Sequence, residues 1–162
     1  MQANLSKSYM SWIVTIGLLF MATSCLKDQS EDQKLEEQRL LQEYLETNNI
    51  TVQPTESGLY YIETLAGSGA QPDSGNSVTV DYTGKLINGN IFDSSQNRGP
   101  FTFQISVEQV IAGWEEGIYM MKKGGKATLI IPSDLGYGAY GSYSIPPYAT
   151  LIFDVELKDI QP

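Results

Sequence analysis

Polar and apolar residues alternate at the start of the segment 78–95, which predicts a strand whose apolar face carries Val78, Val80 and Tyr82. Asn88-Gly89 then favours a tight reversal, because both residue types tolerate a positive φ. The chain returns through Phe92 and Asp93. We therefore expect a hairpin that brings the phenol of Tyr82, the ring of Phe92 and the carboxylate of Asp93 together as the wall of a cleft.

Further strands are predicted over 59–65, 101–107, 127–131 and 150–159, where apolar residues alternate with polar ones or form short runs. Over 110–121 the period changes to that of a helix, with Trp114, Ile118 and Met121 on one face. One short helix can cover one face of a bent sheet. The pattern therefore predicts an α+β domain with a bent antiparallel β-sheet and one short α-helix.

An N-terminal helix is predicted over 31–49, since this segment is rich in helix formers and contains neither Gly nor Pro. Its narrow apolar stripe consists of Leu41, Tyr44 and Leu45, with Leu35 less regularly placed. We expect the stripe to pack on the domain that follows or to serve as a spacer. Dimerisation is the alternative, but a single short helix gives it little support, so we expect a monomer.

An unbroken apolar run, 12–22, precedes this helix. It is shorter than the about 20 residues of a transmembrane helix and fits the core of a secretory signal. The small residues that follow, together with Cys25, resemble a bacterial lipoprotein cleavage box. The resemblance implies cleavage before Cys25 and lipid attachment to its sulfur. The alternative is an ordinary secretory signal followed by an incidental free cysteine.

Three parts are therefore predicted: a lipoprotein signal peptide over 1–24, a lipid-anchored linker and helix over 25–50, and the folded domain over 51–162. Acidic residues shortly after Cys25 resemble the sorting segments of some Gram-negative lipoproteins. We expect a lipid anchor in a bacterial cell envelope, at the outer membrane, on either its periplasmic or its surface face.

Composition and charge narrow the chemistry that this chain can perform. The net charge is −9, so a phosphate backbone would be repelled and nucleic-acid binding is not expected. The sequence contains no histidine, which removes the commonest general base, a Ser-His-Asp triad and the usual zinc sites. Cys25 is the only cysteine, so a disulfide within the chain is impossible. We expect no metal and no cofactor.

Several stretches carry more aromatic or rigid residues than a scaffold requires. They are the hairpin, the residues 110–114 at the helix entry, and the Gly-, Tyr- and Pro-rich loop 137–147. Phe101 and Phe153 come from strands that can line the same concavity. Together these residues predict an aromatic pocket for small apolar or prolyl ligands. Hydrolysis and group transfer are poorly supported, because the sequence offers no nucleophile with an activating base and no phosphate loop.

Four motifs then follow one another from about residue 74 to the end: VDYTGKLINGNIFDSS, PFTF, VIAGWEEGIYMMKKGGKATLIIPSDLGYG and IPPYATLIFDVELKDI. In order and spacing they resemble the FKBP-type peptidyl-prolyl cis-trans isomerases, a more specific signal than one short motif. The resemblance implies a bent antiparallel sheet wrapped around a short helix. It also implies isomerisation of Xaa-Pro bonds in polypeptide clients, binding of the family's macrolide inhibitors, and no cofactor.

The same resemblance assigns roles to individual residues. The family's helix supplies a tryptophan as the floor of the proline pocket, and here that residue is Trp114. The catalytic residues implied are Asp93, Tyr82, Phe92 and Tyr137. The substrate-binding residues implied around Trp114 are Ile111, Val110, Phe101, Phe153 and Ile145. The Ile111 N–H and the Tyr137 hydroxyl would hold substrate carbonyls.

Arg98 matches a basic residue that neighbours the acid and the tyrosine in many members. Whether it belongs to the site or only to a structural ion pair stays open. Taken singly, Trp114, Phe153 and Val110 are better explained by an ordinary core. Their joint occurrence in the family's order favours the site.

The predicted function is therefore rotation about Xaa-Pro bonds in exported proteins, through a desolvated aromatic pocket and without a covalent intermediate. The alternatives are a non-catalytic module that binds proline-containing peptides and an envelope chaperone. Turnover of a proline peptide separates the enzyme from the binding module. Suppression of aggregation that survives mutation of the pocket would identify the chaperone.

Overall fold

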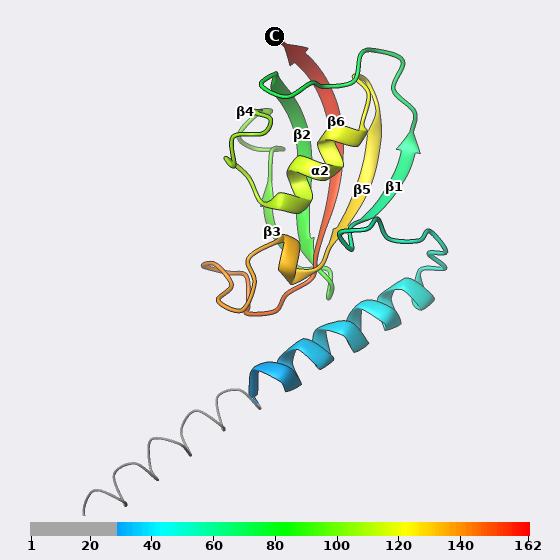
Figure 1. Cartoon of the computed structure of the whole chain (residues 1–162), viewed down its shortest axis with the longest axis vertical. Helices are drawn as coiled ribbons and strands as arrows, with labels where there is room; N and C mark the ends of the chain where they lie inside the picture. The colour runs from blue at the N-terminus through cyan, green and yellow to red at the C-terminus, as the bar shows by residue number, and fades with distance from the viewer. Residues whose placement is uncertain (1–28) are drawn as a thin grey trace, which may run out of the picture. The chain divides into compact units, whose positions relative to one another are not determined.

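The computed structural model describes residues 29–162, and its sheet has six strands that pair antiparallel throughout. Along the chain these are β1 (Tyr60–Leu65), β2 (Ser77–Leu86), β3 (Ile91–Ser94), β4 (Phe101–Gln104), β5 (Lys126–Ile131) and β6 (Leu151–Gln161). The order in space is β1-β5-β6-β2-β3, and β4 also pairs with β2. Helix α2 (Ala112–Met120) lies across one face of the bent sheet (Figure 1), so the predicted α+β fold is confirmed.

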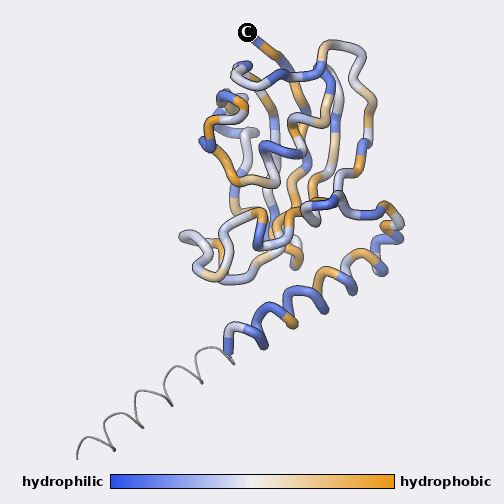
Figure 2. The backbone as a smooth tube through the Cα atoms, viewed as in Figure 1, coloured by the Kyte–Doolittle hydropathy of each residue, from blue (hydrophilic) through white to orange (hydrophobic). Residues whose placement is uncertain are grey.

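The two longest strands, β2 and β6, form the centre of the sheet and pair from Ser77 opposite Gln161 to Leu86 opposite Leu151. Apolar residues alternate with polar ones along them, and the alternation is visible in Figure 2. The residues of β6 that face α2 are all buried: Leu151, Phe153, Val155 and Leu157. We call this side of the sheet the inner face and the opposite side the outer face.

The predicted hairpin is present, as β2 and β3 with a tight reversal between them. The N–H of Leu86 donates to the carbonyl of Asn90 at 2.9 Å, and the N–H of Gly89 donates to the carbonyl of Leu86 at 2.9 Å. Of the Asn88-Gly89 pair only Gly89 has a positive φ, of 87°. A single residue in the left-handed region, Gly89, is therefore enough to reverse the chain here.

Helix α2 presents Trp114 and Ile118 to the inner face, with Met121 buried just beyond its end. Its backbone approaches β5 closely, because a Cβ added at Gly117 would lie 2.6 Å from the Leu129 Cδ1 atom. The helix begins at Ala112, later than predicted. Ile111 is extended, with φ −63° and ψ 149°, so the two residues before the helix lead into it rather than forming its first turn.

The strand predicted over 101–107 ends at Gln104. Positive φ values at Ser106 (66°) and Glu108 (56°) make a continued strand impossible. Phe103 and Ile105 are buried as the alternation predicts, whereas Phe101 is 39% exposed. The early end of the strand leaves a loop that leads to helix α2.

A helix covers residues 29–47, and residues Glu37–Pro162 form one compact unit. Within this unit Leu45 is buried and packs with Ile130 and Ile152 on the outer face, with Leu41 and Tyr44 against the same cluster. The expectation that the stripe packs on the following domain is therefore confirmed. Leu35, which precedes this compact unit, is 63% exposed.

The expected signal peptide and the lipidation site at Cys25 lie outside the described residues. Within residues 29–162, no helix combines the length and apolar character needed to cross a bilayer.

Candidate active site

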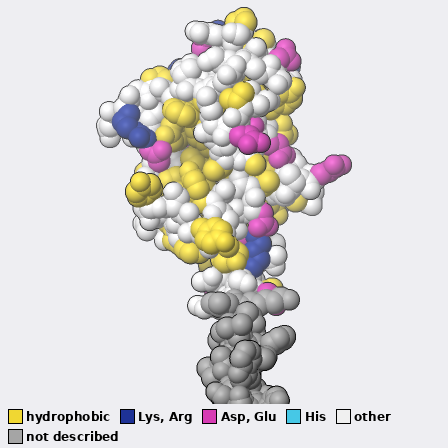
Figure 3. Space-filling view, turned by 60° about the vertical axis from the view of Figure 1, so that its left-hand side comes forward, with side chains coloured by type: hydrophobic (Ala, Val, Ile, Leu, Met, Phe, Trp, Pro, Cys, Tyr) yellow, Lys and Arg dark blue, Asp and Glu magenta, His cyan; other side chains and the backbone are white. Residues whose placement is uncertain are grey.

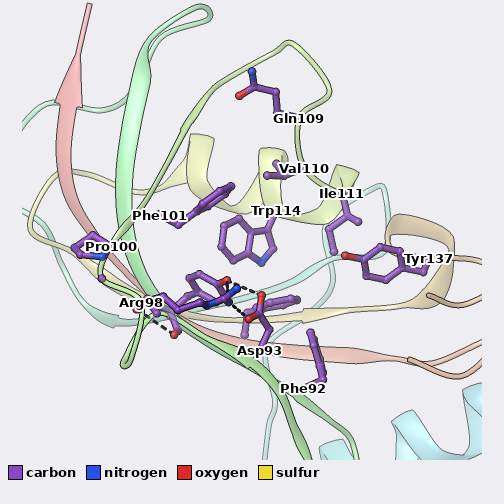
Figure 4. Close-up of a pocket in the computed structure, with 14 residues that line it drawn as sticks. Phe92, Asp93, Arg98, Pro100, Phe101, Gln109, Val110, Ile111, Trp114 and Tyr137 are labelled. Carbon is purple, nitrogen blue, oxygen red and sulfur yellow. Dashed lines mark hydrogen bonds and ion pairs between the residues drawn. The ribbon is translucent and has the colours of Figure 1, made fainter. Parts of the chain in front are cut away.

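A cavity of about 400 Å³ opens at the end of the inner face, beside the start of α2. Every residue expected at the site lines this cavity except Ile145, and Arg98 lines it as well. Figure 3 shows hydrophobic side chains gathered around a hollow on this side of the molecule, with oppositely charged side chains at its rim. Figure 4 shows rings and carboxylate converging on the hollow from separate elements.

Aromatic rings form the floor and walls, with Trp114 at the centre. The indole lies edge-to-face with the Tyr82 ring, at 5.0 Å between centroids and 87° between planes. It meets the Phe153 ring in the same way, at 5.1 Å and 77°. The Phe101 ring lies 6.1 Å away at 61°. Edge-to-face contacts of this kind fix ring orientations, so the floor is preformed.

Gly84 is the residue that lets two of these rings approach the sheet. A Cβ at this position would lie 2.6 Å from Phe153 Cε1 and 2.8 Å from Phe92 Cζ. The Phe92 and Phe153 rings themselves meet edge-to-face at 5.5 Å. Any side chain at Gly84 would displace both rings, so this glycine belongs to the construction of the cavity.

An irregularity between β2 and β3 explains how two consecutive residues reach one cavity. Asp93 pairs with Gly84 and Ile91 pairs with Lys85, so Phe92 has no partner of its own. In a regular strand Phe92 and Asp93 would point to opposite faces. A β-bulge re-aims side chains in this way and is common beside functional sites. Both side chains consequently line the cavity.

The polar edge of the cavity is a hydrogen-bonded cluster of Tyr82, Asp93 and Arg98. The Tyr82 hydroxyl donates to Asp93 Oδ2 at 2.6 Å. Arg98 Nη2 forms an ion pair with Asp93 Oδ1 and donates to the Tyr82 hydroxyl oxygen at 3.1 Å. The structural ion pair considered for Arg98 is therefore present, and Arg98 also lines the cavity. The carboxylate is held in one orientation by partners on both of its oxygens.

Ser95 also belongs to this region, although the sequence indicates only a turn residue there. It is 5% exposed, and its N–H donates to the Tyr82 carbonyl at 3.0 Å. Its hydroxyl accepts from the Tyr82 N–H at 3.0 Å and donates to Asp81 Oδ1 at 3.1 Å. Ser95 thus ties the end of β3 to β2 behind the phenol. The lining residues that the sequence did not indicate are Ser95, Gly99, Pro100 and Gln109.

Candidate donors to a ligand lie on the side of the cavity opposite Asp93. The Ile111 carbonyl accepts from the first turn of α2, whereas its N–H donates to no acceptor among the described residues. Figure 4 shows the Tyr137 hydroxyl turned toward the cavity. The buried Trp114 N–H also lacks a hydrogen-bond partner among residues 29–162.

Ile145 is the one expected residue that does not line the cavity. It is 7% exposed and belongs to the main hydrophobic core. Its N–H and carbonyl exchange hydrogen bonds with Ser142, at 2.7 and 2.9 Å. It therefore packs into the core from the same loop that carries Tyr137, and a direct contact with substrate stays a prediction.

No group of three or more His, Cys, Asp or Glu side chains is placed to hold a metal ion within the described part of the chain.

Comparisons with known proteins agree with the fold. A family model described as FKBP-type peptidyl-prolyl cis-trans isomerase matches residues 68–158. FK506-binding protein 4 of Dictyostelium discoideum is 54% identical over 112 residues, which are 68% of this chain and 30% of that protein. An FK506-binding protein of Neisseria meningitidis serogroup B is 52% identical over 105 residues, 64% of this chain and 96% of that protein.

Among solved structures, the crystal structure of FkpA from Escherichia coli matches with a TM-score of 0.73 at 33% identity, over 99% of this chain and 74% of that one. The chain spans less than half the length of several curated relatives that it matches. The family model covers more than half of the residues, and the Neisseria relative is matched over nearly its whole length. The chain therefore belongs to the FKBP-type peptidyl-prolyl cis-trans isomerases.

Proposed function

We propose that the protein catalyses cis-trans isomerisation of Xaa-Pro bonds in polypeptides, with the proline ring bound on Trp114 and no covalent intermediate. The observation that carries this proposal is the preformed aromatic cavity beside an oriented carboxylate. Membership of the family supports the reaction. The catalytic roles below are assigned to the residues that line the cavity.

The reaction needs no nucleophile, because its barrier comes from resonance in the amide. Rotation about the C–N bond costs roughly 18–20 kcal/mol. The planar amide is more charge-separated than the twisted one, so water stabilises the ground state more than the transition state. A cavity walled by aromatic rings replaces that water, and this lowers the free energy of the twisted amide relative to that of the planar amide.

The polar groups at the rim complete this environment. The Ile111 N–H and the Tyr137 hydroxyl are proposed to donate to the carbonyl oxygens on either side of the proline. Asp93, held by Tyr82 and Arg98, is proposed to face the carbonyl that rotates. An acceleration of about 10⁵ requires roughly 7 kcal/mol, which these contacts and the removal of water would share.

The deciding measurement is the rate of cis-trans exchange in a Xaa-Pro peptide, followed by exchange NMR or by a protease-coupled assay with the purified chain. We expect the Phe92→Ala/Asp93→Ala variant to lose at least about 100-fold in kcat/KM. Ile91→Ala is the matched control on the same strand, because Ile91 is 65% exposed and lies outside the cavity. Equal activity of the double variant and the control would refute the assignment of the cavity. Peptide binding without turnover would instead support a binding module.

The same cavity is proposed to accept macrolides of the FK506 type. The names of two relatives describe them as FK506-binding proteins. The ring-lined floor of this chain offers a similar apolar surface. Competition between FK506 and the Xaa-Pro peptide tests this, and Trp114→Ala is expected to abolish it.

The clients are proposed to be exported proteins, because the sequence begins with features of a lipoprotein signal. The apolar run 12–22 and the lone Cys25 support export and a lipid anchor in the cell envelope. Mass analysis of the mature N-terminus tests this proposal: a diacylated or triacylated Cys25 is expected. An unmodified cysteine would leave only the ordinary secretory signal.

A further inference from the structure

The unusual polar feature outside the cavity is a buried carboxylate on the N-terminal helix. Glu37 is 4% exposed. Its Oε1 atom accepts from the Ser133 N–H at 2.6 Å and from the Thr150 hydroxyl at 3.1 Å, and its Oε2 atom accepts from the Ser133 hydroxyl at 2.7 Å. Hydrogen bonds to a charged acceptor are about twice as strong as neutral ones. The contact is therefore a strong link between segments 96 and 113 residues apart.

The two partners of Glu37 stand at the two ends of one loop. Ser133 follows the end of β5, and Thr150 directly precedes β6. The loop between them carries Tyr137, which lines the cavity. Glu37 consequently joins the two ends of the loop that supplies the hydroxyl proposed to bind substrate.

Ser133 passes this link on to Tyr137 through the backbone. The Ser133 carbonyl accepts from the Gly136 N–H and from the Gly138 N–H, each at 2.9 Å. These amides flank Tyr137 on both sides. The Gly138 carbonyl in turn accepts from the Tyr148 N–H at 2.9 Å, which joins the outgoing and returning arms of the loop.

The outer part of the loop gives Tyr137 one direct contact, because the Gly141 N–H donates to the Tyr137 carbonyl at 3.2 Å, and the loop is also held by the buried Ile145. Tyr140 and Tyr143 are 94% and 111% exposed, so the rings at the tip do not pack on the domain. The base of the loop nevertheless holds the amides on both sides of Tyr137, so a looser base would loosen the orientation of Tyr137.

The helix that carries Glu37 is itself fixed on the sheet. Glu37, Leu41 and Leu45 are spaced four residues apart and lie on one helical face. Leu45 is buried against Ile130 and Ile152 on the outer face. Leu41 and Leu45 thus anchor the helix, and Glu37, one turn before Leu41 on the same face, places its carboxylate beside Ser133 and Thr150.

We propose that Glu37 is a positioning residue of the isomerase: it clamps Ser133 and Thr150 and so fixes the Tyr137 hydroxyl for substrate. This inference rests on the proposed function for its kinetic consequence, but not for the clamp itself. It gives the N-terminal helix a part in the reaction beyond that of a spacer.

The test compares two substitutions of Glu37 in the full chain. Glu37→Ala leaves the Ser133 and Thr150 donors without this acceptor, and we expect kcat/KM to fall about tenfold. Glu37→Gln keeps an oxygen for the Ser133 N–H and offers an amide N–H to the Ser133 hydroxyl, so we expect it to retain activity within about threefold of the original. Glu43→Ala is the control on an exposed face of the same helix and is expected to leave kcat/KM unchanged.

A double-mutant cycle separates positioning from a general effect on the fold. If Glu37 acts through the Tyr137 hydroxyl, Glu37→Ala in a Tyr137→Phe background lowers kcat/KM by less than about twofold. An undiminished loss in that background would overturn the proposal. Should Glu37→Ala fail to fold, the Ser133→Ala/Thr150→Val variant removes the hydroxyl partners instead and is expected to show the same cycle.

Amide hydrogen exchange gives a readout that does not depend on activity. Faster exchange of the Gly136 and Gly138 amides in Glu37→Ala, restored in Glu37→Gln, supports the clamp; unchanged exchange contradicts it. If the original chain lacks isomerase activity, the proposed function fails, while the exchange data still decide whether Glu37 orders the loop.

Discussion

The two faces of the sheet bury apolar surface in different ways, and the hollows beside them differ in lining: aromatic rings line the inner one, whereas charged and hydroxyl side chains such as Lys126, Asp154 and Glu156 line the outer one. The inner face packs aromatic rings around Trp114 and leaves an apolar hollow of about 400 Å³ at its edge. The outer face buries a small cluster around Ile130 and Ile152 beneath the N-terminal helix.

The rest of the outer face is covered by paired charges. Lys85 lies 2.9 Å from Asp154, and Glu156 lies 3.0 Å from both Lys126 and Lys158. Such exposed pairs contribute little to stability and offer no apolar surface to a ligand. The inner face is therefore the one that we propose to bind ligands, and the outer face stabilises the framework.

The largest effect is expected from Trp114→Ala. The side chain is 4% exposed, so its removal should lower the free energy of unfolding by about 3–5 kcal/mol. It also removes the proposed floor for the proline ring, and we expect kcat/KM to fall by at least about 100-fold. Denaturant unfolding and the peptide assay at a temperature where the variant is folded measure the two effects separately. Activity close to that of the original chain would show that the proline ring does not bind on Trp114.

Gly84→Ala tests the inner face without removing any atom. The new Cβ would meet Phe153 Cε1 and Phe92 Cζ at 2.6 and 2.8 Å, so both rings must move. Overpacking of this kind destabilises by about 1–3 kcal/mol. We expect a roughly tenfold loss of kcat/KM and a changed near-ultraviolet circular dichroism signal. A variant with unaltered ring signals would show that the cavity tolerates a side chain here.

Leu45→Ala tests the outer face. It removes a 6%-exposed side chain from the cluster around Ile152, so the free energy of unfolding should fall by about 2–4 kcal/mol. The cavity residues are untouched, and Glu37 keeps its own hydrogen bonds. We therefore expect a loss of kcat/KM smaller than the loss caused by Glu37→Ala, measured in parallel. A larger loss would mean that the two faces are not separate in function.

The smallest effect is expected from the charges of the outer face. Hydrogen bonds from Lys158 and then Lys126 lower the pKa of Glu156 from its ordinary value of 4.5. The ionised Glu156 carboxylate therefore contributes fully to stability above about pH 4.5, and this contribution is lost as the pH falls through the lowered pKa of the folded state. Solvent screening keeps the contribution below about 1 kcal/mol.

Glu156→Gln is accordingly expected to destabilise the chain slightly at about pH 6, and by progressively less as the pH falls below 4.5, as measured by urea unfolding. Isomerase activity should be unchanged at about pH 6. An activity loss would place this ion pair in communication with the cavity.

The order of polar and apolar residues was enough to predict the strands and the short helix, and the family motifs were enough to predict most cavity residues. Alternation along β2 and β6 assigns their inner faces, since a strand's side chains alternate strictly. One departure is Ile152, which is buried beside Leu151 and Phe153 although it points outward. The N-terminal helix covers it, and period alone does not reveal that cover.

Tertiary structure alone decided how those residues meet. The bulge that turns Phe92 and Asp93 into one cavity has no local sequence signature, because it depends on how β2 and β3 pair. In the sequence Ser95 looks like a turn residue and Glu37 like an acidic residue on an exposed helix face. The partner of Ser95 is set by strand pairing, and the partner of Glu37 is distant in the chain. Alternation and motif order fix which side chains face the core, whereas pairing register and long-range hydrogen bonds fix where their atoms lie.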